Sequence, residues 1–131
     1  MMRRRRHRPL RPPILQVDFD GVLHHHRAGW RGADVIEDDP VPGSVEFLRE
    51  AVEYGFRVAV YSGRSQCPEG IEAMRAWLAR HAGAADWLDR IEWPEQPPNA
   101  QVKLDDRALT FTGEWPAMET LAAFRPWNRR A

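Results

Sequence analysis

The chain has 131 residues, of which 43% are hydrophobic and 29% are charged, and this composition is typical of a globular protein long enough to bury one core. Its one cysteine, Cys67, excludes an intrachain disulfide and a cage of cysteine ligands around a metal. No apolar run approaches the roughly 20 residues of a membrane-spanning helix, so we expect no membrane partner and a cytoplasmic location.

The basic residues are distributed unevenly along the chain. The formal net charge is zero, but six arginines lie close to the N-terminus, and the remainder of the chain is acidic: Arg3, Arg4, Arg5, Arg6, Arg8 and Arg11. We expect residues 1–13 to form a disordered basic arm and residues 14–131 to form one domain. A run of like charges is usually solvated, but it can also bind nucleic acid, and both interpretations stay open.

Residues 14–19 are predicted to form the first strand, because they are mostly apolar, follow two prolines and end before Gly21. Asp18 and Asp20 stand at the end of this stretch, and alternate residues of an extended chain point to the same side. Two adjacent carboxylates repel each other, which a bound cation or a shifted pKa would relieve. The pattern therefore predicts a functional site at this strand end.

The next elements are predicted to alternate between helix and strand. Residues 24–42 have no periodic pattern and are expected to form a loop, and a helix follows, with Ser44 as its cap and Gly55 as its end. Residues 56–62 are predicted to form a strand and residues 68–82 a second helix. This alternation favours a parallel sheet with right-handed crossovers.

The remaining elements are short. Residues 86–93 are predicted to form a helical turn or a strand, residues 102–105 a strand, residues 108–111 a further short strand, and residues 118–124 a terminal helix. The predicted fold is an α/β domain with three Rossmann-like layers around a mostly parallel central sheet.

Three predicted strands end in polar residues that could together bind a metal ion and a phosphate. Ligands of open parallel sheets bind beyond the carboxyl ends of the strands. Carboxylates are hard oxygen ligands that suit Mg²⁺, while a hydroxyl and the backbone of a glycine can bind phosphate oxygens. The three groups are Asp18 with Asp20, Ser62 with Gly63 and Arg64, and Asp105 with Asp106.

These strand ends resemble motifs of the haloacid dehalogenase-like (HAD) phosphatase superfamily. The first motif of the family is similar to residues 18–22, the second to residues 58–64, and the fourth to Asp105 and Asp106. The resemblance implies an HAD-like domain with a minimal cap, because residues 24–42 are too few for a cap domain. It also implies a Mg²⁺-dependent phosphomonoester hydrolase with a phosphorylated substrate.

The resemblance also implies the roles of individual residues. Asp18 corresponds to the nucleophile, which forms an aspartyl-phosphate, and Asp20 to the general acid and base. The expected metal-binding residues are Asp18, Asp20, Asp105 and Asp106, with Asp106 favoured over Asp105 as the direct ligand. The expected phosphate-binding residues are Ser62, Gly63, Arg64 and Lys103.

The third motif of the family contains a lysine, and Lys103 is the only lysine of the chain. It lies two residues before Asp105, about 7 Å back along the predicted strand. Either Lys103 reaches the phosphate or an arginine, Arg64 or Arg107, replaces it.

The open site and the basic arm favour a nucleotide or a polynucleotide end as the substrate. Two alternatives stay open. The chain could be an HAD-fold binding or regulatory protein with little turnover, or a nucleic-acid-binding module that uses the arginine-rich arm.

Overall fold

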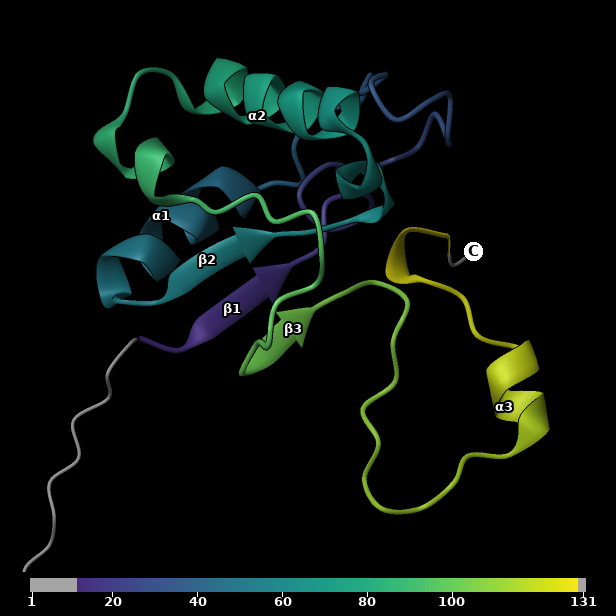
Figure 1. Ribbon diagram of the computed structural model, residues 1–131. Helices are drawn as coiled ribbons and strands as arrows, with labels where there is room; N and C mark the ends of the chain where they lie inside the picture. The colour runs from purple at the N-terminus through teal and green to yellow at the C-terminus, as the bar shows by residue number, and fades with distance from the viewer. Residues whose placement is uncertain (1–11, 130–131) are drawn as a thin grey trace, which may run out of the picture.

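The computed structural model describes residues 12–129, so the six arginines of the predicted basic arm lie outside the described residues. Three parallel strands form one sheet in the order β2-β1-β3 (Figure 1). Their bounds are Ile14–Val17 for β1, Arg57–Val60 for β2 and Val102–Leu104 for β3. The parallel pairing predicted from the alternation of helices and strands is confirmed, as is the α/β class.

Helix α1 (Ser44–Tyr54) connects β1 to β2, and helix α2 (Pro68–Ala82) follows β2. Between and after them lie the short 3₁₀ helices η1 (Gly63–Gln66) and η2 (Asp86–Arg90). The C-terminal part contains α3 (Met118–Ala122) and η3 (Trp127–Arg129). None of the helices that the structure describes is both long and apolar enough to span a membrane.

The core lies between the sheet and the two long helices. Leu15 and Val17 of β1 pair in register with Val58 and Val60 of β2, and this alternation turns these four side chains to one face. They form one apolar cluster with side chains of both helices, including Leu48, Val52, Met74, Trp77 and Leu78. Burial of these side chains, at about 1.5–3 kcal/mol each, fixes the strands whose ends carry the predicted site.

The connection from η2 to β3 runs across the sheet in Figure 1. At its start, Glu92 adds one parallel bridge to Ala59 of β2, so residues 86–93 contain both a helical turn and a short strand pairing. Pro94, Pro97 and Pro98 follow, and they provide no N–H groups for a helix. This connection therefore contains no helix that could form the third layer of the predicted architecture.

Two local predictions were wrong. Gly43, with φ of 86°, precedes α1 as its cap, and Ser44 is the first helical residue, whose Oγ donates to Leu23 O at 2.9 Å. Residues 108–111 do not form a strand: they pair with no strand of the described part of the chain, and Leu109 and Phe111 remain exposed, so little apolar burial would stabilise one.

Candidate active site

The carboxylates predicted at two strand ends come together. Asp18 follows β1, and Asp105 and Asp106 follow β3. The backbone N–H of Asp18 donates to Leu104 O at 3.0 Å, which aligns the ends of the two strands. As a result, one carboxylate oxygen from each of Asp18, Asp105 and Asp106 lies within 4.8 Å of the others. We name these three residues the carboxylate cluster.

The environment of Asp18 disfavours its negative charge. Burial, the nearby charge of Asp105 and a hydrogen bond with Asp106 raise the pKa of Asp18 from 3.8 to about 8, against the opposing effect of the Phe19 N–H donor. A cation placed between the three carboxylates would remove this repulsion. Hard oxygen ligands in this number fit Mg²⁺, which usually keeps several waters in addition to its protein ligands.

Residues 18–43, which connect β1 to α1, are named the first loop, and Gly21 allows this loop to approach the carboxylate cluster. Its φ is +81°, and a Cβ at this position would collide with the carboxylate of Asp106. The geometry thus explains why a glycine follows Asp20: a larger residue at this position would displace Asp106 from Asp18.

Asp20 lies in a second, differently charged environment. Arg64 Nε donates to its Oδ1 at 2.9 Å, and His24 Nε2 lies 2.6 Å from the same oxygen. Burial would raise the pKa of Asp20, but the hydrogen bonds from His24 and Arg64 and the charge of Arg64 outweigh it and lower the pKa below 3.8. Asp20 is therefore held ionised.

Arg64 joins Asp20 to the loop that follows it. Its Nη1 donates to three backbone carbonyls, those of Gly32, Ala33 and Val35, at 2.8–3.0 Å. The ring of Trp30 lies 4.9 Å from Cζ of Arg64, whose exposure is only 1%. This guanidinium serves as a structural anchor, and a phosphate could reach it only if these contacts were broken.

The histidines after the first motif form a group with Asp20. His26 N–H donates to Nδ1 of His24 at 3.2 Å, so Nε2 of His24 carries the hydrogen that faces Asp20. His26 Nδ1 lies 3.6 Å from Asp20 Oδ1. A metal could in principle bind Asp20, His24 and His26. Arg64 already contacts the same Asp20 oxygen, and its positive charge makes this group a poorer cation site than the carboxylate cluster.

The end of β2 lies beside that of β1, since Tyr61 N–H donates to Val17 O at 3.1 Å. Ser62 is buried, and its Oγ caps η1 by accepting from the N–H of Arg64 at 3.0 Å. Gly63 is exposed, and no atom lies within 4 Å of the position that a Cβ would occupy. The backbone of Gly63 is therefore the open surface of this strand end.

Lys103 is exposed in the middle of β3. It pairs in register with Gln16, and Asp18, directly after β1, continues the alternation of Gln16. Lys103 thus stands on the same face of the sheet as Asp18, one step back from the strand end.

The C-terminal residues hold the first loop through side-chain hydrogen bonds that the sequence did not suggest. We name Trp127–Arg129, which form η3, the C-terminal clasp. The three bonds run from Trp127 Nε1 to Gly21 O at 2.7 Å, from Asn128 Nδ2 to His25 O at 2.7 Å, and from Arg129 Nη2 to His26 O at 3.0 Å. No periodic pattern or motif marks contacts between residues more than 100 positions apart.

The structure thus brings all three predicted strand ends to one edge of the sheet. Asp18 lies with Asp105 and Asp106, while Asp20 lies with Arg64 instead. Comparison of the chain with models of protein families, with curated proteins and with solved structures found no match.

Proposed function

We propose that the protein is a Mg²⁺-dependent phosphomonoester hydrolase that acts through an aspartyl-phosphate on Asp18, within an HAD-like domain with a minimal cap. The observation that carries this proposal is the convergence of Asp18 with Asp105 and Asp106 beyond the carboxyl ends of two parallel strands. The open backbone at Gly63 on the neighbouring strand end supports it.

The carboxylate cluster would hold the cation. Asp106 is favoured as a direct ligand because it packs against Gly21 and hydrogen-bonds with Asp18. Asp20 is assigned to proton transfer instead of metal binding, since Arg64 and His24 already hold it. Mg²⁺, when bound, supplies charge neutralisation of the phosphate oxygens and of the carboxylates around them.

The substrate enters as the monoanion of a phosphate monoester, and its proton passes to Asp20, which is otherwise ionised because its pKa is lowered. Asp18 attacks the phosphorus, the ester P–O bond breaks, and the leaving oxygen takes up this proton from Asp20. Water then attacks the phosphorus of the aspartyl-phosphate and gives its proton to Asp20. Cleavage of the bond between phosphorus and Asp18 releases phosphate.

The phosphate oxygens would be bound by the backbone at Gly63 and by Lys103, with Ser62 shaping the turn. Lys103 is favoured over Arg64 because Lys103 is exposed on the face of Asp18, whereas the Nε and Nη1 donors of Arg64 are occupied. Arg107 stays exposed beside the cluster.

The test is a panel of phosphomonoesters assayed for phosphate release, including nucleoside monophosphates and 3′- and 5′-phosphorylated oligonucleotides. Each substrate is measured with Mg²⁺ and with a chelator in its place. We expect release that depends on Mg²⁺. The proposal is contradicted if no member of the panel is hydrolysed, or if hydrolysis is the same in the chelator.

A binding protein with little turnover is the second candidate, and the ion pair of Asp20 with buried Arg64 favours it. A carboxylate locked in this way is a weak proton carrier, so phosphate could bind without being released from its ester. Affinity for a nonhydrolysable phosphonate in the presence of Mg²⁺, without turnover of any ester, would identify this function.

A further inference from the structure

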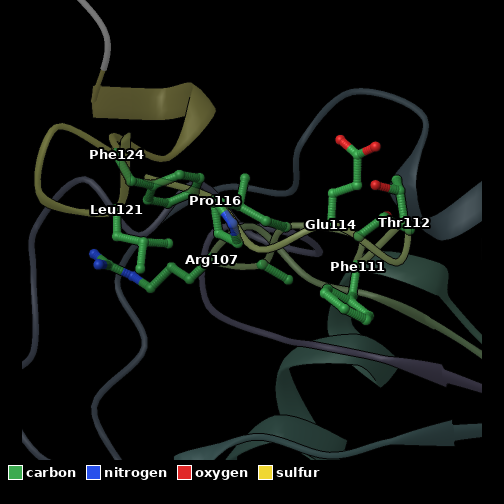
Figure 2. A pocket seen from close by; sticks show the side chains of 10 residues that line it. Arg107, Phe111, Thr112, Glu114, Pro116, Leu121 and Phe124 are labelled. Carbon is green, nitrogen blue, oxygen red and sulfur yellow. The ribbon is translucent and has the colours of Figure 1, made fainter. Parts of the chain in front are cut away.

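Residues 105–126, which we name the C-terminal arm, line an open cavity of about 610 Å³ (Figure 2). Cavities of a few hundred to about 1,000 Å³ are typical of small-molecule sites in proteins. Figure 2 shows Arg107, Leu121 and Phe124 toward one end of the cavity and Phe111, Thr112 and Glu114 toward the other.

Both ends of the C-terminal arm are attached to the candidate active site. At its start, Asp105 and Asp106 belong to the carboxylate cluster, and Arg107, the next residue, lines the cavity. Near its end, Phe124 also lines the cavity. Three residues later, Trp127 of the C-terminal clasp donates its Nε1–H to Gly21 O. The chain therefore leads from the cation-binding residues into the wall of the cavity and back to the first loop.

The lining combines apolar walls with a few polar groups. Leu109, Phe111, Leu121 and Phe124 supply the walls. Three of these four are substantially exposed, with 50% for Leu109, 56% for Phe111 and 46% for Leu121, so a ligand in the cavity would cover apolar surface that now contacts water. Aromatic side chains of this kind stack on nucleobases at about 1–3 kcal/mol per base.

The polar groups of the cavity match the rest of a nucleotide. Arg107 offers a cation beside the carboxylate cluster, where the phosphate of a substrate would lie. Glu114 and Thr112 offer oxygens that can accept from ribose hydroxyls or from an exocyclic amine. We infer that this cavity binds the nucleoside part of a nucleotide whose phosphate is held at the carboxylate cluster. This inference rests on the proposed function and names the substrate class of the same site.

The experiment compares adenosine 5′-monophosphate with ribose 5-phosphate, which carry the same phosphate on the same sugar and differ only in the base. Affinities are measured by calorimetry with Mg²⁺ in the Asp18→Asn background, where turnover is blocked. We expect ribose 5-phosphate to bind at least tenfold more weakly than the nucleotide. Phe111→Ala and Leu121→Ala should each weaken nucleotide binding by about tenfold and leave ribose 5-phosphate unchanged.

Met118→Ala is the matched control, because Met118 lies on the same arm, is 72% exposed and does not line the cavity. Equal affinities for the two ligands, or equal effects of Phe111→Ala and Met118→Ala, would overturn the inference. It would also be overturned by a dimer in solution that Phe111→Ala dissociates, since the cavity would then be an interface between two copies of the chain.

Failure of this inference can be told apart from failure of the proposed function. If the wild-type protein hydrolyses both esters with the same KM and kcat, the proposed function stands and the cavity has no role in recognition of the base. If the nucleotide binds preferentially but neither ester is hydrolysed, the cavity is a nucleotide site and the proposed catalytic function is wrong.

Discussion

Asp18 and Asp20 are two residues apart, yet their surroundings shift their pKa values in opposite directions. Burial and the carboxylates of β3 raise the pKa of Asp18, while His24 and Arg64 lower that of Asp20 against its burial. Asp18 would thus need a nearby cation to be ionised at neutral pH, whereas Asp20 is ionised without one. This division of roles is the chemical basis of the proposed function.

The raised pKa of Asp18 predicts how stability depends on pH without metal. The unfolded chain loses this proton near pH 3.8, whereas the folded protein keeps it up to about pH 8. Stability should therefore fall as pH rises from about 4 to about 8 and level off above, because in this window the folded state binds more protons than the unfolded state.

Asp18→Asn removes this titration and should melt about 5 °C or more above the wild type at pH 8 in a chelator. At pH 4 the two melting temperatures should be close. Melting curves across this range, recorded by circular dichroism, check the prediction. Parallel pH profiles of the two proteins would show that Asp18 does not carry the raised pKa.

Substitution of Arg64 is expected to lower mainly the stability of the fold, and substitution of Lys103 mainly the catalytic rate. Arg64→Met leaves Asp20 without its buried counter-charge and three carbonyls without their donor, so it should destabilise the fold by about 3–5 kcal/mol. Lys103→Met should leave stability nearly unchanged, because Lys103 is exposed, but lower kcat/KM about 10²-fold. Urea unfolding and steady-state kinetics of both variants separate these effects. Wild-type kcat/KM in Lys103→Met would show that Lys103 does not serve the phosphate.

At the scale of elements, the strand ends were predictable and the contacts between distant segments were not. Apolar runs that end in Asp18 and Ser62 mark short buried strands, the short run before Asp105 marks the exposed edge strand β3, and parallel pairing then places the three ends at one edge. The use of Arg64 as an anchor could not be read from its neighbours, because its partners include carbonyls of a loop without any pattern. The contacts of the C-terminal clasp could not be predicted either, because their acceptors are backbone oxygens, which every residue type provides.

Because the C-terminal clasp is hydrogen-bonded to the first loop, we expect substitutions in the clasp to affect the candidate active site. Trp127→Phe keeps an aromatic ring but removes the Nε1–H that holds Gly21 O, and Gly21 packs against Asp106. Loss of this bond should cost about 1 kcal/mol of stability. The resulting shift of the first loop should lower kcat/KM by about tenfold and weaken Mg²⁺ binding.

Trp115→Phe is the control for Trp127→Phe, since Trp115 lies on the C-terminal arm with 86% exposure; because its ring packs on Phe111, both variants are assayed with an ester that carries no base. Kinetics and Mg²⁺ calorimetry of the two variants provide the comparison. If both variants retain the kinetics and the Mg²⁺ affinity of the wild type, the C-terminal clasp has no part in positioning the site.

On the scale of the whole molecule, the protein combines a well-packed body with a loosely packed C-terminal arm. The sheet and the two long helices bury a continuous apolar cluster, whereas Leu109, Phe111, Trp115, Met118 and Leu121 of the arm are exposed. The α/β class follows from periodic apolar patterns, which report such burial directly. Within the arm only the short helix α3 forms, and the arm is held at its start by the pairing of β3 with β1 and at its end by the C-terminal clasp.

We propose that Asp18 becomes phosphorylated during Mg²⁺-dependent hydrolysis. The most direct measurement is acid quenching during turnover of the best ester of the panel, followed by mass spectrometry of the peptide that contains Asp18. We predict a phosphoryl group on Asp18 that appears only with Mg²⁺ and is absent in Asp18→Asn, whose turnover falls at least 10³-fold while its fold is retained. An Asp18→Asn variant with wild-type turnover, or a phosphoryl group found on another residue, would contradict the account.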